Sequence, residues 1–228
     1  MIKIAFITSG SGSILDHCFK INSFKDTIHS IVLDRKCGAI EVAKKHKKIF
    51  FLIEESSSVD YSRKLLNYLD SEQIDYAISY SNLKILKGAI LNEYHNRIFN
   101  SHFSILPAFK GFYHKGESQN DIPAMRIFER TLDYRSLICG NTIHVIEKKI
   151  DNGQPVLVGI ICIPYNQSEK LTRQKLFEIE CKTLMQFTIW LFQNRLKTQN
   201  EIYIKDVKFN NLNFSPNLED NDIINFNL

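Results

Sequence analysis

A chain of 228 residues is long enough for one domain with a sizeable hydrophobic core, and its 44% hydrophobic and 24% charged residues exclude wholesale disorder. Its 29 basic and 25 acidic residues give a net charge of +4, which is too weak a bias to indicate a nucleic-acid partner but is compatible with a small phosphorylated or carboxylated ligand. Five widely spaced cysteines include no Cys-x-x-Cys pair, which is typical of free thiols in a reducing compartment and argues against a zinc site.

The N-terminus begins directly with an apolar strand pattern and shows no leader sequence. No later segment is apolar over the length that a membrane helix needs. We therefore expect a cytoplasmic protein that binds neither membrane nor nucleic acid.

Short apolar runs alternate with helical periodicity as far as Pro107. The expected strands are residues 2–8, 28–33, 49–53, 76–80 and 98–102. The expected helices are residues 14–20, 38–47 and 85–94, and one that is capped by Ser57 or Ser58 and places Leu65, Leu66 and Leu69 on one face. Short strands that are apolar on both faces and separated by helices predict an α/β fold with a Rossmann-like, doubly wound, mostly parallel sheet.

The rhythm changes after Pro107. Residues 108–137 mix glycines, aromatics and charges, which predicts a lid or insertion near a site, with one helix at 123–132. Strands at 142–147 and 156–163 follow, joined by a tight turn at 151–153 as an antiparallel pair at the sheet edge. A long helix then begins near Ser168 and ends near Asn194.

The last residues, from Lys205, are asparagine-rich and poorly patterned, which predicts a strand remnant and a loose tail. We therefore expect one domain at residues 1–204, with an atypical insertion at 112–137, and a C-terminal tail at 205–228.

The run RIFNSHFSILP at residues 97–107 is the most informative part of the sequence. Residues i and i+2 of a strand point to the same face, so Asn100 and His102 should project side by side at the end of one strand. An amide donor beside a titratable ring can stabilise the negative charge that develops on a carbonyl oxygen. The plain alternative is a polar strand end that enters a loop.

The run SGSGS at residues 9–13 follows the first strand and opens the first helix. Backbone N–H groups at such a turn can bind a phosphate, and the glycines allow it to approach closely. The run lacks both the full dinucleotide fingerprint and the lysine of a P-loop, so a simple tight turn is the alternative.

Three further polar residues give no functional signal by themselves. Asp151 precedes Asn-Gly and is an ordinary turn residue. His144 lies inside an apolar strand, so its interpretation as a hydrogen-bonded core residue is favoured over a catalytic role. Glu180 lies on the long helix, where its spacing alone suits a surface charge.

Taken together, these motifs resemble those of the folate-dependent formyltransferases, and within them the glycinamide ribonucleotide branch. The resemblance covers about residues 1–107 and 138–195, and its motifs are residues 9–13, 100–107, 142–144 and 151–154. It implies transfer of a formyl group from the co-substrate 10-formyltetrahydrofolate to the primary amine of glycinamide ribonucleotide, a step of purine biosynthesis, without a metal ion.

The resemblance also implies roles for particular residues. Asn100, His102 and Asp151 would be catalytic: Asn100 and a protonated His102 stabilise the oxyanion, while Asp151 keeps His102 charged and helps to move the proton. The residues implied in substrate binding are Gly12, Ser13 and Ile14 for the phosphate and Glu180 for the amine. The residues implied in folate binding are Lys84, Ile85, Leu86 and Ile150.

Two departures from the family pattern keep other functions open. Ile14 stands where the family usually has asparagine, and residues 112–137 are longer than the family's acceptor loop. One alternative is an N-formyltransferase acting on a nucleotide-linked 4-amino sugar. Another is a non-catalytic protein that binds folate or phosphate ligands. The expected partner is a small amine that bears phosphate, and a homodimer stays open.

Overall fold

Strand β1 (Ile4–Thr8) lies at the centre of the sheet, and all five of its residues are buried. It pairs in parallel with β2 (Ile28–Leu33) on one side and with β4 (Tyr76–Tyr80) on the other. A strand that is covered on both faces must be apolar throughout, which explains the continuous run IAFIT. The computed structural model describes residues 2–110, 123–164, 166–196, 198–199, 201–202 and 214–215.

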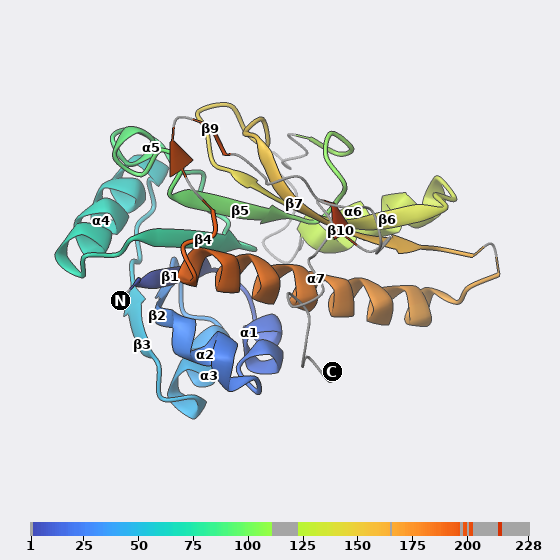
Figure 1. Ribbon diagram of the computed structural model, residues 1–228, viewed down its shortest axis with the longest axis horizontal. Helices are drawn as coiled ribbons and strands as arrows, with labels where there is room; N and C mark the ends of the chain where they lie inside the picture. Colours follow the sequence, from blue (N-terminus) through green and yellow to red (C-terminus); the bar gives the residue numbers. More distant parts are fainter. Residues whose placement is uncertain are drawn as a thin grey trace.

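The main sheet has eight strands in the order β10-β7-β6-β5-β4-β1-β2-β3 (Figure 1). The other strands of this sheet are β3 (Ile49–Leu52), β5 (Ile98–His102), β6 (Ile138–Val145), β7 (Pro155–Cys162) and β10 (Phe214–Ser215). The first five strands are parallel, and each later strand is antiparallel to its neighbour. The predicted Rossmann-like, mostly parallel sheet with an antiparallel edge is thus confirmed. A separate pair consists of β8 (Thr198–Gln199) and β9 (Glu201–Ile202).

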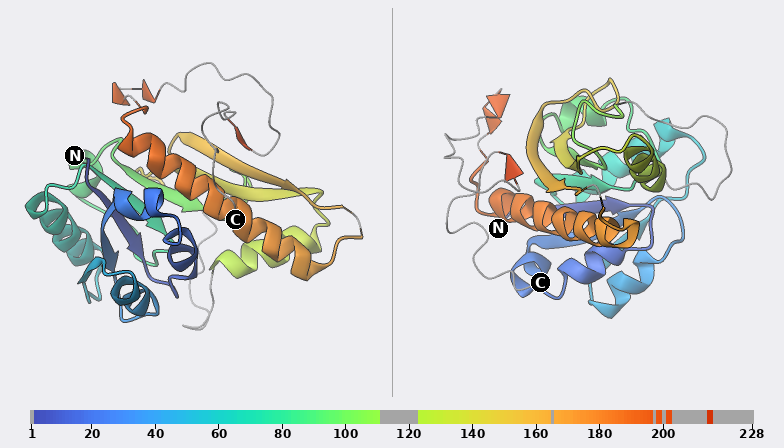
Figure 2. Two further views of the ribbon diagram at one scale, coloured as in Figure 1. Left: turned by 60° about the horizontal axis from the view of Figure 1, so that its bottom comes forward. Right: turned by 90° about the vertical axis from the view of Figure 1, so that its right-hand side faces the viewer.

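Helices cover both faces of the sheet (Figure 2). One face packs against α1 (Ser13–Cys18), α2 (Asn22–Thr27), α3 (Ala39–Lys45) and the long α7 (Glu169–Phe192). The other face packs against α4 (Ser58–Ser71) and α5 (Ile90–Glu93). Helix α6 (Pro123–Asp133) matches the helix expected in the atypical insertion, whereas residues 111–122 of that insertion lie outside the described residues.

Several expected elements were wrong in extent. The helix expected at 85–94 is only α5, because Gly88 has φ +76° and the helix begins just after this left-handed residue. The strand expected at 142–147 begins earlier, at Ile138, and ends at Val145. Residues 146–154 therefore form a loop between β6 and β7 in place of the expected tight hairpin. Helix α2 was not expected.

Two further expectations concern burial and the cysteines. Strand β3 was expected to be covered on both faces, but it is the last strand of the sheet and three of its four residues are exposed. All five cysteines are free thiols, as the sequence predicted. No helix among the described residues combines the length and the apolar composition that a membrane crossing needs. The domain boundary at residue 204 stays a prediction.

The sequence offered two caps for α4, and the structure selects Ser57. Its side-chain oxygen accepts hydrogen bonds from the N–H groups of Val59 at 3.1 Å and Asp60 at 3.4 Å. These bonds satisfy two of the backbone donors that every helix start leaves open.

We expect Ser57→Ala to lower the free energy of unfolding by about 1 kcal/mol, the usual value for a lost N-cap. In a chain of this size the melting temperature should fall by about 2–4 °C. Ser58→Ala is the matched control, because the capping bonds belong to Ser57. Thermal unfolding followed by circular dichroism measures both; equal shifts would contradict the assignment.

Candidate active site

Strands β5 and β6 bring polar side chains together on one face of the sheet. Asn100 is paired directly with His144, and His102 is paired with Thr142. Partners that lie opposite each other in an antiparallel pair point to the same face, so all four share one surface. Asn100 Nδ2 and His144 Nε2 are 3.2 Å apart.

The third predicted catalytic residue comes from the loop between β6 and β7. Asp151 has φ +50°, a left-handed conformation that aspartate tolerates better than most residues. Two residues later, a side chain at Gly153 would put its Cβ 1.9 Å from the carbonyl oxygen of Val145. The Asp-x-Gly motif therefore has a structural cause: glycine lets the loop close against β6, and the closed loop turns Asp151 back over the strands.

The Asp151 carboxyl group lies between two imidazole rings. Its Oδ2 is 3.6 Å from His102 Nδ1, and its Oδ1 is 3.5 Å from His144 Nε2. All three side chains are largely buried. The structure thus brings together Asn100, His102 and Asp151, which the sequence predicted, and adds His144.

His144 is the functional candidate that the sequence argument misjudged. It is a buried strand histidine, as expected, but it is not merely a core residue. Its Nδ1 lies 2.8 Å from the backbone oxygen of Val145, which leaves Nε2 facing Asn100 and Asp151. The motif at residues 142–144, on a strand expected in the antiparallel pair at the sheet edge, was the signal that could have revealed it.

Burial is the largest influence on the pKa of His102. It lowers the pKa of the ring below its ordinary value of 6.5, His144 adds to this effect, and Asp151 acts in the opposite direction. The sequence argument expected Asp151 to keep His102 charged. The effect of the carboxylate has the expected sign, but desolvation outweighs it, so the resting ring is neutral at pH 7. His102 Nε2 is buried and has no hydrogen-bond partner in the described residues.

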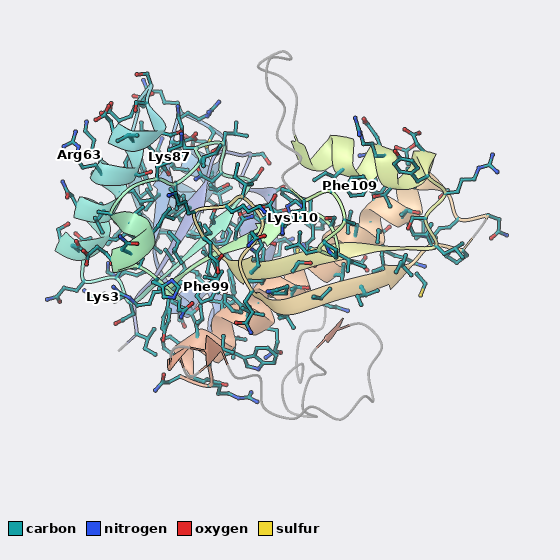
Figure 3. The ribbon with its side chains drawn as sticks, turned by 90° about the horizontal axis from the view of Figure 1, so that it is seen from above. Lys3, Arg63, Lys87, Phe99, Phe109 and Lys110 are labelled. Atoms are coloured by element: carbon teal, nitrogen blue, oxygen red, sulfur yellow. The ribbon has the colours of Figure 1, made fainter. Side chains whose placement is uncertain are left out.

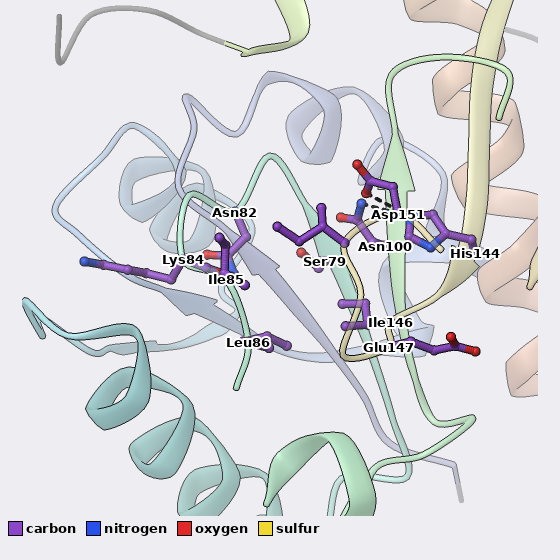
Figure 4. Close-up of a pocket in the computed structure, with 11 residues that line it drawn as sticks. Ser79, Asn82, Lys84, Ile85, Leu86, Asn100, His144, Ile146, Glu147 and Asp151 are labelled. Carbon is purple, nitrogen blue, oxygen red and sulfur yellow. Dashed lines mark hydrogen bonds and ion pairs between the residues drawn. The ribbon is translucent and has the colours of Figure 1, made fainter. Parts of the chain in front are cut away.

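A pocket opens beside this cluster (Figure 4). Asn100, His144 and Asp151 line one side of it, whereas His102 does not line the pocket and adjoins it through Asp151, at 3.6 Å. The predicted folate-binding residues line it as well: Lys84, Ile85, Leu86 and Ile150. Further lining residues are Ser79, Asn82, Ile146 and Glu147.

Asn82 helps to shape the loop after β4 that lines this pocket. Its Nδ2 donates to the backbone oxygen of Lys84 at 3.0 Å, and its Oδ1 accepts from Ser9 Oγ at 3.3 Å. Ser9 Oγ also accepts from the N–H of Leu83 at 2.8 Å. The loop after β1 and the loop after β4 are therefore fixed to each other, a coupling for which the sequence gave no signal.

The segment after β5 is also held in place. Thr142 Oγ1 donates to the oxygen of Ser104 at 2.8 Å and accepts from the N–H of Leu106 at 3.0 Å. Lys110 Nζ donates to Asn152 Oδ1, so this segment reaches the Asp151 loop. In Figure 3, Lys110 lies near the centre of the molecule and Phe109 lies beside α6.

Glu180 lies apart from the catalytic cluster. Tyr80 is paired with Ser101 and so points to the face opposite Asn100, where its hydroxyl donates to Glu180 Oε2 at 2.9 Å. Glu180 is buried and is not the surface charge that its helical spacing suggested. Burial raises its pKa to about 7, and the Tyr80 hydrogen bond acts against this rise.

The expected phosphate-binding residues also lie outside the pocket. The Ile14 side chain is buried in the core, so only its backbone could meet a phosphate. Gly12 has φ +78°, and a Cβ there would lie 2.8 Å from Ala39 Cα. Close packing of α1 on α3 is thus sufficient to explain Gly12. Ser13 begins α1 and is exposed.

Comparison with known proteins decides the family. Residues 2–188 match the family model described as Formyl transferase. The chain belongs to the formyl transferase family. It is therefore an enzyme of the class that uses formyltetrahydrofolate as the formyl donor.

The relatives of this formyltransferase are distant. It is 22% identical over 160 residues to the phosphoribosylglycinamide formyltransferase of Mycobacterium tuberculosis, with 68% of each chain covered. It is 21% identical over 225 residues to the protein of the same name from Haemophilus influenzae, covering 91% of this chain and 95% of that one. The crystal structure of glycinamide ribonucleotide transformylase 1 from Symbiobacterium toebii matches with a TM-score of 0.73 at 20% identity, covering 90% of this chain and 95% of that one. At this identity the structural match establishes the fold.

No group of three or more potential metal ligands occurs in the part of the chain that the structure describes. The expected absence of a metal ion stays a prediction.

The position of Asp151 makes a prediction about His102. Because the carboxylate raises the pKa of the ring, Asp151→Asn should lower it further below 6.5. NMR titration of the histidine ring signals in both proteins measures the shift. Asp133→Asn, on α6, is the matched control and should leave the His102 signal unchanged. A higher pKa in Asp151→Asn would contradict the ion pair.

Proposed function

We propose that this formyltransferase moves the formyl group of 10-formyltetrahydrofolate to the primary amine of glycinamide ribonucleotide. The observation that carries the proposal is the convergence of Asn100, Asp151 and His144 on a pocket whose remaining wall is formed by the loop after β4. A cytoplasmic enzyme of purine biosynthesis is the setting that this reaction implies.

The pocket suits the ring system of a folate. Ile85, Leu86, Ile146 and Ile150 supply apolar walls for a flat ring. Residues 82–86 run along the pocket as a loop, since the helix expected from residue 85 begins only at Ile90, and a backbone outside regular helix or strand at Ile85 and Leu86 can turn N–H and C=O groups to the polar edge of a pterin. The formyl group would then lie towards Asn100 and Asp151.

The proposed chemistry follows from the groups that face the pocket. A neutral amine attacks the formyl carbon, and the carbonyl oxygen becomes an oxyanion to which the Asn100 amide donates a hydrogen bond. The amine gives one proton to the Asp151–His102 pair as the new C–N bond forms. The same proton passes to the leaving folate nitrogen as the old C–N bond breaks, so no net proton is gained or lost.

His102 and His144 have separate tasks in this proposal. His102 is neutral at rest and so can share the proton that Asp151 receives. His144 accepts one N–H of Asn100 and thereby orients the amide, which leaves the second N–H free for the oxyanion.

The names of the relatives favour glycinamide ribonucleotide. In that case Gly12, Ser13 and Ile14 would contact the phosphate through backbone N–H groups, and Glu180 would hold the amine end. Because Tyr80 and His102 end neighbouring strands, a ligand at the carboxyl edge of the sheet could reach both faces.

A second acceptor class is favoured by two observations. Tyr80 already covers Glu180, and the Ile14 side chain is turned into the core. A site for a small phosphorylated amine would leave Glu180 open to the amine and would offer a polar side chain at position 14 to the phosphate, and this chain does neither. A nucleotide-linked 4-amino sugar is therefore the alternative acceptor, and a protein that binds folate without turnover is the second alternative.

Purified protein with 10-formyltetrahydrofolate and each acceptor separates these functions. We expect formylation of glycinamide ribonucleotide. The absorbance of the released tetrahydrofolate and mass spectrometry of the amine both measure this reaction. His102→Ala should reduce kcat by about 10²–10⁴-fold and Asn100→Ala by about 10²–10³-fold. If only the amino sugar is formylated, it replaces glycinamide ribonucleotide as the acceptor. If neither acceptor is formylated but folate still binds, the protein is a folate-binding protein without turnover.

The buried carboxyl group predicts a pH dependence. With a pKa of about 7, Glu180 becomes an ionised hydrogen-bond acceptor as the pH rises through 7, so KM for the amine should fall over that range. Tyr80→Phe removes the bond that lowers this pKa, so the same fall should occur at higher pH. Glu180→Gln should abolish the pH dependence while KM for the folate stays unchanged. A KM that follows the wild-type pH profile in Glu180→Gln would contradict this role.

A further inference from the structure

Three polar side chains form a chain of hydrogen bonds on the face of the sheet along which α7 runs (Figure 1). They are Ser101 on β5, Asn141 on β6 and Thr183 on α7, and each is at most 2% exposed. Asn141 Nδ2 donates to Ser101 Oγ at 3.3 Å, and Thr183 Oγ1 donates to Asn141 Oδ1 at 3.1 Å. We call these three residues the buried amide link.

The surroundings of the buried amide link are apolar. Phe99 and Ile143 lie on the same face of the strand pair as Ser101, and Phe99 packs edge-on against Phe187 of α7 with ring centroids 4.8 Å apart. An apolar side chain in place of Asn141 would fill this interface without the desolvation of an amide. Stability alone therefore does not explain why a polar residue stands there.

The neighbouring strand is shaped to admit the buried amide link. Gly159 on β7 is paired with Asn141. A Cβ at Gly159 would lie 2.3 Å from Thr183 Oγ1 and 2.6 Å from Asn141 Oδ1. Any side chain at this position would displace both partners of the hydrogen bond, so the bond depends on a glycine in a third element.

The buried amide link joins the strands that carry the candidate catalytic side chains. Ser101 stands between Asn100 and His102 on β5, and Asn141 precedes His144 by three residues on β6. Successive side chains of a strand point to opposite faces, so the link lies behind the strand pair that presents Asn100 opposite His144. Hydrogen bonds are short and directional, whereas apolar contacts tolerate sliding. The link therefore resists movement of β5, β6 and α7 along one another.

On α7 the buried amide link ends close to Glu180. Thr183 Oγ1 also lies 2.6 Å from the backbone oxygen of Ile179, which fixes the hydroxyl within the helix. Glu180 follows Ile179 directly and so lies within one helical turn of Thr183. The link thus also sets the position of the Glu180 carboxyl group relative to β5 and β6.

We propose that Asn141 is a positioning residue for formyl transfer. Through Ser101 and Thr183 it holds β5, β6 and α7 in the relative position in which Asn100 meets His144. Asn141 acts only through these residues and contacts neither substrate. The inference rests on the roles proposed above for Asn100 and His144, and its first test needs no turnover.

The main test replaces the whole link by apolar side chains: Ser101→Ala, Asn141→Leu and Thr183→Val together. Because no partner is left unpaired, the melting temperature of this triple variant should stay near the wild-type value or rise. Asn141→Leu alone leaves the Ser101 hydroxyl unpaired and should melt lower. Thr188→Val is the matched control, since Thr188 is buried on α7 and donates to the Leu184 oxygen at 2.7 Å but makes no hydrogen bond to the sheet in the described residues.

NMR of the substrate-free variants measures the position of the candidate catalytic pair. The side-chain NH₂ signals of Asn100 report its contact with His144 (Figure 4). We expect these signals to shift and broaden in the triple variant, because the pair then samples more than one arrangement. Thr188→Val should leave them unchanged.

Kinetics measures the consequence for the reaction. Because a misplacement of about 1 Å can slow a reaction about 10²-fold, kcat of the triple variant should fall by about 10–100-fold. KM for the folate donor should change far less, since Ser9 and Asn82 hold the loop after β4 without the link. If the wild type formylates neither acceptor, the proposed function fails, and the NMR comparison still decides this inference.

A conservative pair of variants separates positioning from packing. Thr183→Ser keeps the hydroxyl and should retain the wild-type Asn100 signals and kcat, whereas Thr183→Val has the same shape as threonine and should lose both. Unchanged Asn100 signals with a wild-type kcat, in the triple variant or in Thr183→Val, would make the buried amide link purely structural and overturn the proposal.

Discussion

The placement of one carboxyl group between two imidazole rings constrains much of this structure. Asp151 is largely buried, and a buried carboxylate is tolerated only where nearby groups compensate its lost hydration. His102 and His144 can do so because the antiparallel pairing of β5 with β6 sets them on one face of the sheet. The loop that carries Asp151 reaches them because Gly153 can lie against β6. A change in the strand register or in the loop would therefore separate the cluster.

The two halves of the sheet serve different purposes around this cluster. The parallel half, centred on β1, is covered by helices on both faces and holds the loops after β1 and β4 in fixed positions. Strands β5 and β6 and the loop after β6 carry His102, His144 and Asp151. The pocket lies where the loop after β4 faces the ends of β5 and β6, and residues of that loop and of the two strands line it together.

The titration of the site follows from where each group is buried. His102 stays neutral because the loss of hydration outweighs the attraction of Asp151. Burial also raises the pKa of Glu180, on the opposite face, to about 7. The Tyr80 hydroxyl donates a hydrogen bond that holds this carboxyl group in place. In the proposed reaction, one face would supply the groups that share a proton, and Glu180 on the other face would supply an acceptor whose charge changes near neutral pH.

The amino-acid sequence by itself determined the fold class and the five parallel strands, because apolar periodicity is a local property. Its motifs also singled out Asn100, His102 and Asp151, which the structure brings together and whose catalytic roles stay a proposal. It misjudged the helix at 85–94 and the hairpin at 151–153, where a single left-handed glycine and a longer loop decide the outcome. Only the tertiary structure showed that His144 belongs to the site, that Glu180 is buried under Tyr80, and that β3 is an exposed edge. These properties depend on which strand lies beside which, and contacts between distant segments leave no periodic trace in the chain.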